Sequence, residues 1–201
     1  KMRYVDGEIY EGSWKDNKRE GKGILTLDSG DILKGEWRND ILQPVVEIQF
    51  PNGDSYSGET QNFKFYGKGI YTWRDGSTYN GEWKASMKEG YGKAIWSDGV
   101  TYSGSWKQGY FHGFGVLEDA NSIYKGGWVN GRKEGKGVVI WKKSHLQEGW
   151  WVNGKLEHVV RSQVIVGERS ETEFLAAEPV NQNSGNSLSE RKENLMKLCE
   201  K

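Results

Sequence analysis

Residues 79–101 read YNGEWKASMKEGYGKAIWSDGVT, and the chain then begins the same pattern again with YSGSW at residues 102–106. Related openings of the form Tyr-x-Gly-x-Trp stand at residues 10, 33, 56, 124 and 147, with substitutions in some copies. The spacing is 23 residues, except for one step of 22 between Tyr102 and Tyr124. Self-similarity at one fixed period indicates a repeat array, in which each repeat is a supersecondary unit stacked on its neighbours.

Each repeat contains further glycine signals. A Gly-x-Gly pair follows the Trp position by seven residues in five repeats, at residues 21/23, 67/69, 90/92, 113/115 and 135/137. A turn signal precedes the next Tyr position, as in Asn52-Gly53, Asp75-Gly76 and Asp98-Gly99. Asn-Gly and Asp-Gly between short aromatic or β-branched runs are strong hairpin signals, because glycine adopts positive φ at little cost. We therefore expect two short antiparallel strands per repeat, joined by a glycine-rich bend.

The Gly-x-Gly pairs raise the question of whether they bind a phosphate or serve the fold. No Gly-Lys-Ser/Thr sequence of a phosphate-binding loop occurs. Period-two alternation places the second glycine of a pair, such as Gly92, on the same face as Ala94 and Trp96. We expect these glycines to leave space for large rings of neighbouring strands, among them Trp83, Trp96 and Trp106.

The whole pattern, Tyr-x-Gly-x-Trp-x-x-Gly-x-x-x-Gly-x-Gly at a 23-residue period, resembles the MORN repeat over about residues 4–158. The resemblance implies an all-β fold, namely an elongated, twisted, single-layer antiparallel β-meander in which each repeat packs only on its neighbours. It also implies a scaffold or adaptor that organises cytoskeletal or ciliary assemblies, positions partners at membranes, or dimerises.

The chain divides by composition into three parts. We expect the MORN-repeat array at residues 1–158, then a capping strand, short helix and linker at 159–186, and an amphipathic C-terminal helix or docking peptide at 187–201. In the last part, Leu188, Leu195 and Leu198 recur near helical spacing after the linker-like VNQNSGNS. A solvated tail helix, a docking peptide for a MORN sheet and a fused partner peptide stay open as interpretations. Asp6-Gly7 lies at an inter-repeat turn position, so residues 1–5 are expected to end an earlier repeat.

Two irregular repeats suggest where a partner binds. The second repeat has Pro44-Val45-Val46 in place of Gly-x-Gly, so its strand is expected to sit differently, and the third has Thr60 in place of Trp. A compensated repacking and a partner-binding surface for a peptide or helix are both open interpretations. The predicted partner-binding residues are Ile41, Leu42, Phe63, Phe65, Trp73, Trp96, Tyr110 and Phe111.

The composition argues against several classes of protein. Lys and Arg number 28 and Asp and Glu also 28, so the basic surplus expected of a nucleic-acid binder is missing. Only 35% of residues are hydrophobic, yet 10 Trp and 10 Tyr concentrate the apolar surface in side chains that can hold a narrow core together. The single Cys199 rules out an intrachain disulfide and suggests a reducing, cytoplasmic location. The resemblance adds cytoskeletal or membrane association to that expectation.

Enzymatic activity is not expected. The sequence has no kinase catalytic loop and no nucleophile elbow. His112, His145 and His158 have no cluster of Cys or carboxylates at metal-ligand spacing. We therefore predict no catalytic residue, no metal and no cofactor.

Two further partner types stay open. The sequence contains no run of 18 apolar residues that could span a membrane. A basic cluster could still bind an anionic membrane surface weakly, with about 1 kcal/mol of binding free energy per basic residue. The cluster consists of Arg132, Lys133, Lys136, Lys142 and Lys143. An ordinary solvated face is the alternative interpretation of these residues. A homodimer formed through an array end or edge strand is the other open partner type.

Overall fold

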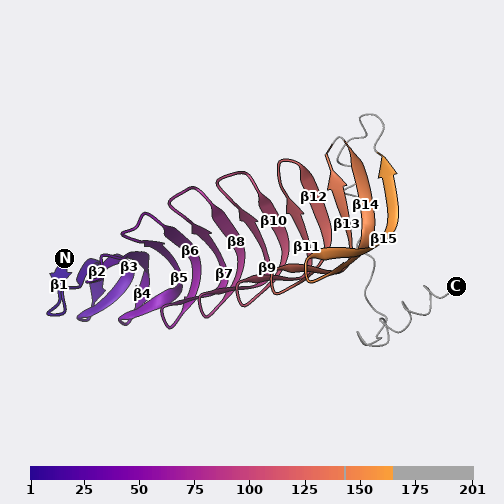
Figure 1. The fold of residues 1–201 in the computed structure, drawn as a ribbon. Coiled ribbons are helices and arrows are strands. Elements are labelled where there is room, and N and C mark those ends of the chain that lie inside the picture. The colour runs from indigo at the N-terminus through magenta and orange to yellow at the C-terminus, as the bar shows by residue number, and fades with distance from the viewer. Residues whose placement is uncertain (143, 165–201) are drawn as a thin grey trace, which may run out of the picture. The chain divides into compact units, whose positions relative to one another are not determined.

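A single sheet accounts for all the secondary structure that the computed structural model describes, which covers residues 1–142 and 144–164. Its strands follow one another in chain order, each hydrogen-bonded antiparallel to the next (Figure 1). The strands are β1 (Met2–Arg3), β2 (Ile9–Lys15), β3 (Lys18–Thr26), β4 (Ile32–Arg38), β5 (Ile41–Gln49), β6 (Ser55–Gln61), β7 (Lys64–Thr72), β8 (Thr78–Lys84), β9 (Met87–Ile95), β10 (Thr101–Lys107), β11 (Tyr110–Glu118), β12 (Ser122–Val129), β13 (Arg132–Trp141), β14 (His145–Val152) and β15 (Lys155–Val164). The predicted all-β, single-layer antiparallel meander is confirmed.

The strands pair into seven hairpins, from β2–β3 to β14–β15, one for each predicted repeat. Before them, β1 pairs with β2 through Met2 and Arg3. The last strand, β15, begins before residue 158 and continues beyond it, so the sheet extends past the expected end of the array. The predicted short helix and linker, and the predicted C-terminal helix with Leu188, Leu195 and Leu198, lie outside the described residues. No described helix is long and apolar enough to cross a membrane.

Each hairpin closes through a two-residue turn whose two residues both have positive φ. In the second hairpin these are Asn39 and Asp40, at φ 48° and 69°, and in the fourth they are Ala85 and Ser86, at 50° and 64°. Positive φ at both central positions defines the type I′ turn, whose twist matches the right-handed twist of the flanking strands. The hairpin turns therefore line one edge of the sheet, and the turns between repeats, with Gly76 at φ +87°, line the other.

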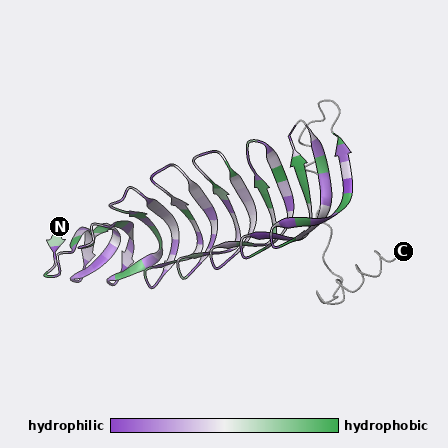
Figure 2. Cartoon of the chain, in the orientation of Figure 1, coloured by the Kyte–Doolittle hydropathy of each residue, from purple (hydrophilic) through white to green (hydrophobic). Residues whose placement is uncertain are grey.

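The core lies on one face of the sheet, since buried and less buried residues alternate along strands such as β10, and each strand carries hydrophobic and hydrophilic residues (Figure 2). The repeat Tyr is fully buried there and covers the glycines of its own hairpin. A Cβ atom on Gly92 would lie 2.4 Å from the hydroxyl oxygen of Tyr79, and one on Gly81 would lie 2.6 Å from it. The prediction that these glycines make room for rings is thus confirmed. The prediction of which rings fill that room was wrong. The repeat Tyr fills it, and not Trp83, Trp96 or Trp106.

In five repeats the repeat Trp packs against the Tyr of the preceding repeat. Trp106 lies edge-on to Tyr102 of its own repeat and to Tyr79 of the preceding one, with 5.1 Å between ring centroids in both pairs. Its Nε1 also donates a hydrogen bond to the carbonyl oxygen of Gly92, at 3.1 Å. The first glycine of the pair is required for a different reason: Gly90 adopts a positive φ of 59°, which glycine tolerates best. We call the face that holds these rings the aromatic face.

The irregular second repeat keeps the common register. Gly35 pairs with Val46 as Gly12 pairs with Gly23 in the first repeat, so the expectation that β5 sits differently was wrong. The reason is a compensating exchange, since the repeat Tyr is replaced by the smaller Leu33, and Val46 fills the space of a ring. Both side chains are buried.

Candidate functional site

In the five repeats that have the repeat Tyr, one position lies against its ring, and the other two repeats have the corresponding position. It is the second residue after the hairpin turn, and we call it the stacking position. It is occupied by Arg19, Leu42, Phe65, Lys88, Phe111, Lys133 and Leu156. Phe65 stacks on Tyr56 with 3.9 Å between ring centroids, and Phe111 stacks on Tyr102 at 3.8 Å. Two of the predicted partner-binding aromatics are therefore half-buried parts of the repeat core.

Lys88 occupies the stacking position of the fourth repeat and lies among three rings. Its Nζ is 4.7 Å from the ring centroid of Trp73, 5.1 Å from that of Tyr79 and 4.8 Å from that of Trp106. A cation over the faces of Trp and Tyr is stabilised by the ring quadrupoles. Desolvation lowers the pKa of Lys88, because the rings exclude water from the charged amine.

A depression of about 310 Å³ opens on the aromatic face beside this lysine, and we call it the aromatic depression. Its lining is mostly apolar, with one cation. The lining residues are Phe65, Tyr71, Trp73, Trp83, Ser86, Met87, Lys88 and Gly109. Large rings around one fixed charge suit a ligand that presents an apolar group next to a polar one.

The predicted partner-binding residues separate into three groups. Phe65 and Trp73 meet at the aromatic depression. The second group is partly buried in the core: Trp96 and Phe111 contact each other, with ring centroids 6.0 Å apart, and Leu42 packs against the core in the second repeat.

Ile41, Phe63 and Tyr110 form the third group, at the hairpin turns, where 67%, 75% and 59% of each residue is exposed. Sequence reasoning missed Met87 and Lys88. Counting back in twos from Gly92 would have placed Lys88 on the aromatic face.

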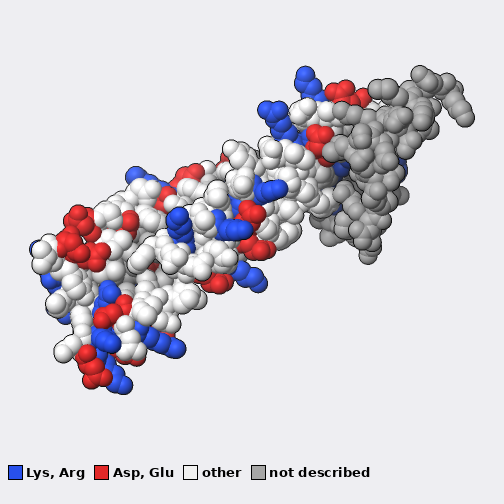
Figure 3. Space-filling model, turned by 90° about the horizontal axis from the view of Figure 1, so that it is seen from below, with Lys and Arg blue, Asp and Glu red and all other residues white. Residues whose placement is uncertain are grey.

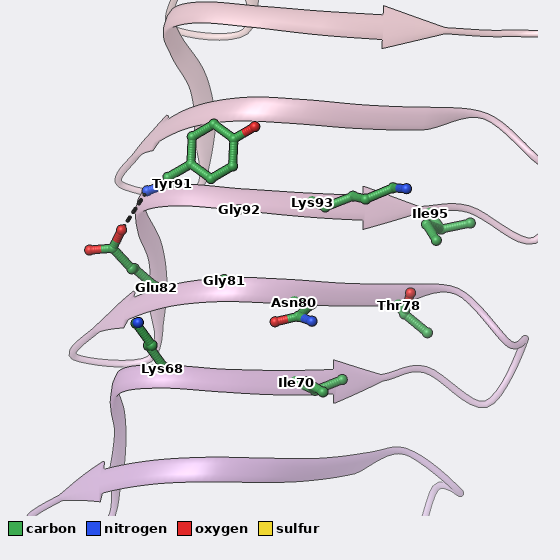
Figure 4. A pocket seen from close by; sticks show the side chains of 10 residues that line it. All are labelled: Lys68, Ile70, Thr78, Asn80, Gly81, Glu82, Tyr91, Gly92, Lys93 and Ile95. Atoms are coloured by element: carbon green, nitrogen blue, oxygen red, sulfur yellow. Dashed lines mark hydrogen bonds between the residues drawn. The ribbon is translucent and has the colours of Figure 1, made fainter.

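A second depression, of about 650 Å³, lies on the opposite face of the sheet (Figure 4). Lys68 and Ile70 of β7 line one side, and Tyr91, Lys93 and Ile95 of β9 line the other, with short side chains of β8 between them. The carboxylate of Glu82 accepts a hydrogen bond from the backbone N–H of Tyr91 at 3.0 Å. Aliphatic and charged groups alternate along it, and it lacks the ring cluster of the aromatic depression.

The predicted basic cluster is not gathered into one patch. Lys133 lies over the ring of Tyr124 on the aromatic face, 4.4 Å from its centroid. Lys136 forms an ion pair with Glu148 at 2.8 Å, and Lys142 forms one with Glu118 at 2.7 Å. Arg132 begins β13, whereas Lys142 follows its end, and Lys143 lies outside the described residues. On the face that Figure 3 shows, acidic and basic side chains are interspersed.

The described residues contain no group of three or more His, Cys, Asp or Glu side chains that could hold a metal ion. The titratable groups with the largest shifts are tyrosines, namely Tyr71 and four of the repeat tyrosines. Burial raises the pKa of Tyr56 to about 12 and raises those of Tyr79, Tyr102 and Tyr124 further. Their hydroxyls donate to backbone carbonyls, as Tyr79 does to Glu82 at 3.0 Å, so these groups serve the fold.

Comparison with known proteins agrees with the geometry. The family model of the MORN repeat matches residues 10–32, 67–78, 79–101, 102–122 and 124–145, which together make up half of the chain. The chain belongs to the MORN-repeat family. It is thus a structural repeat module, built from hairpins whose Tyr, Trp and glycines interlock.

Other comparisons add little about function. No curated protein matches the chain in sequence. Among solved structures, the wild-type TCP10 domain of CPAP from Danio rerio matches with 12% identity and a TM-score of 0.28, over 81% of this chain and 98% of that one. A mutant of the same domain matches with 10% identity and a TM-score of 0.21, over 81% and 97%. Likeness at this level does not indicate what the chain binds.

Proposed function

We propose that this chain is a non-enzymatic scaffold that binds a peptide or helix of a partner protein on the aromatic face around β7 to β11. The observation that carries the proposal is Phe63. It occupies the second position of a type I′ turn at φ +58°, with 75% of the residue exposed. A bulky residue at positive φ is a backbone outlier, and such strain concentrates at binding sites. The other hairpins have Asn, Asp, Ser or Gly at this position.

The surroundings of Phe63 support the proposal. Two residues later Phe65 lines the aromatic depression, and Met87 lines it too while 45% exposed. Ile41 and Tyr110 extend the exposed apolar surface along the same edge of hairpin turns. Aromatic side chains and Met are enriched at protein interfaces, where a few buried anchors contribute most of the affinity.

Site-specific photo-crosslinking tests the proposal. Benzoyl-phenylalanine replaces Phe63 in one variant and Tyr91, on the opposite face, in another, and each is irradiated in cells that express the chain. We expect a discrete crosslinked partner from position 63 and none from position 91. The same partner from position 91 alone would contradict the assignment of the binding face.

The edge strand β15 favours self-association as a second candidate function. It pairs with β14 on one side, and no other described strand pairs with it. Val159, Val160 and Val164 of this strand are exposed, and an exposed apolar edge is a template for strand addition.

Sedimentation equilibrium tests this candidate. A monomer mass at all protein concentrations would exclude it, and a shift toward the dimer as concentration rises would support it.

A further inference from the structure

Three repeats have a cation at the stacking position, and they differ in the carboxylates near it. Arg19, over the ring of Tyr10, forms an ion pair with Asp40, with 3.3 Å between Nε and Oδ1. The charge of Asp119 acts on Lys133 and opposes the lowering of its pKa by burial. Lys88 forms no ion pair with any carboxylate among the described residues.

The difference between Arg19 and Lys88 comes from one residue of the following hairpin turn. The backbone N–H of Asp40 donates to the carbonyl of Arg19 at 3.1 Å, and that of Gly109 donates to the carbonyl of Lys88 at 2.9 Å. Gly109 therefore stands to Lys88 as Asp40 stands to Arg19. Gly109 has no side chain, so the space beside Lys88 that corresponds to the Asp40 carboxylate beside Arg19 is open. A Cβ on Gly109 would meet no atom within 4 Å.

Among the described residues, no oxygen atom accepts a hydrogen bond from the ammonium group of Lys88. The three rings stabilise its charge but accept no conventional hydrogen bond, and an ammonium has three N–H donors. Lys88 and Gly109 both line the aromatic depression, so the amine borders a space that a ligand can enter. A carboxylate placed there would form a charge-assisted hydrogen bond in surroundings drier than bulk water.

We propose that the space beside Gly109 receives the side-chain carboxylate of an Asp or Glu residue of the partner protein, which pairs with Lys88. A large apolar side chain next to that acidic residue enters the aromatic depression. The inference rests on the proposed function and adds the chemistry of the partner segment, namely an acidic residue adjoining a large apolar one.

Two blocked pentapeptides provide the probe. One is Ser-Leu-Glu-Phe-Ser with an acetylated N-terminus and an amidated C-terminus, so its only carboxylate is the Glu side chain, and the other has Gln for Glu. Each is titrated into the full chain labelled with ¹³C-lysine, and the ¹³Cε resonance of Lys88 is followed by NMR. We expect saturable shifts with the Glu peptide, and binding roughly tenfold weaker with the Gln peptide. Equal affinity for both peptides, or no shift with either, overturns the inference.

Two matched variants locate the site. Gly109→Asp should supply the missing carboxylate from within the chain, restore the arrangement of Arg19 and Asp40, and reduce binding of the Glu peptide at least tenfold. Gly131→Asp adds the same charge at the equivalent turn beside Phe111, which is no cation, and should leave binding within twofold of the unchanged chain. If Gly109→Asp binds like the unchanged chain while its backbone amide spectrum shows a native fold, the inference fails.

These results separate the inference from the proposed function. A partner that crosslinks to position 63 and binds Gly109→Asp unchanged would preserve the proposed function and refute the role of Lys88. Peptide binding that depends on Lys88, together with no crosslinked partner at position 63, would preserve the carboxylate site and contradict the proposed scaffold.

Discussion

At the scale of single residues, the room beneath the repeat Tyr ring determines which strand positions can have a side chain. Gly92 has no room for a side chain, because the hydroxyl oxygen and ring carbons of Tyr79 lie 2.4–2.6 Å from where a Cβ would stand. The next residue, Lys93, points to the opposite, solvent-facing side and is exposed. Two neighbouring positions of one strand thus have opposite tolerance for the same substitution.

Gly92→Val should destabilise the chain by about 3 kcal/mol, because Val forces the buried ring of Tyr79 out of place. The midpoint of urea unfolding, followed by Trp fluorescence, measures the change. Lys93→Val is the matched control, and we expect its free energy of unfolding to stay within about 0.5 kcal/mol of the unchanged chain. Similar losses in both variants would mean that space under the ring is not the cause.

The buried tyrosines predict a loss of stability at alkaline pH. In the unfolded chain the phenol of Tyr56 ionises near pH 10, whereas burial raises its pKa to about 12 in the folded chain. Between these values the unfolded state releases a proton that the folded state keeps. The stability contributed by Tyr56 is therefore complete below pH 10 and is lost as the pH rises through 12, with a total of about 3 kcal/mol.

Thermal unfolding at pH 8 to 12 checks the sign and the source of this effect. Tyr56→Phe should lower stability at pH 8 through the lost hydrogen bond to the Glu59 carbonyl. Its stability should then fall less steeply above pH 10 than that of the unchanged chain. Parallel curves for the two proteins would rule out Tyr56 as a contributor.

The residue scale also shows what sequence could and could not predict. Period-two alternation correctly put Gly92 on the aromatic face and indicated a ring above it. It named the wrong rings because alternation gives the face of a side chain but not the direction in which it leans. Tyr79 is directly opposite Ala94, yet its ring reaches along the strand to Gly92.

At the scale of the element, the third hairpin turn combines strain with exposure. Its residues Asn62 and Phe63 have φ 50° and 58°, the geometry that Asn-Gly satisfies without strain. Side chains in this region cost roughly 1 kcal/mol relative to glycine. The sequence marks Phe63 as an unusual turn residue, but its strain follows only from the register of β6 and β7, in which Gln61 pairs with Lys64.

Phe63→Gly should therefore raise the free energy of unfolding by about 0.5–1 kcal/mol and weaken partner binding at the same time. Urea unfolding gives the first quantity, and titration with the crosslinked partner gives the second. The equivalent change Asn17→Gly, at the second turn position of the first hairpin and outside β7 to β11, should leave binding unchanged. Destabilisation by Phe63→Gly would show that the phenyl ring supports the fold instead.

At the scale of the whole array, most of the architecture could be predicted, because the repeat period determines the number and order of the hairpins. Seven copies of Tyr-x-Gly-x-Trp predicted seven hairpins, and the sheet has them in chain order. The candidate site could be predicted only in part. Phe65 and Trp73 were among its predicted residues. The role proposed for Lys88 could not be predicted, because it follows from comparing Asp40 with Gly109. Only the hydrogen bonds of the structure show which turn residue lies beside which stacking position.

The array thus presents two faces with different surfaces to a partner, and we propose that the partner binds the aromatic face. Met87 lines the aromatic depression and Phe63 stands in the hairpin turn two residues before Phe65, while Tyr91 and Phe114 alternate with Gly92 and Gly115 and so point to the opposite side, and all four are exposed. Substituting any of these four removes an apolar side chain that the core does not need. The comparison therefore isolates the binding face from effects on stability.

The most direct test is the dissociation constant of the crosslinked partner for four variants, each with one of these residues changed to Ala. We expect binding at least about tenfold weaker for Phe63→Ala and for Met87→Ala, and within twofold of the unchanged chain for Tyr91→Ala and Phe114→Ala. The reverse order, with loss of affinity confined to Tyr91→Ala and Phe114→Ala, would contradict binding on the aromatic face.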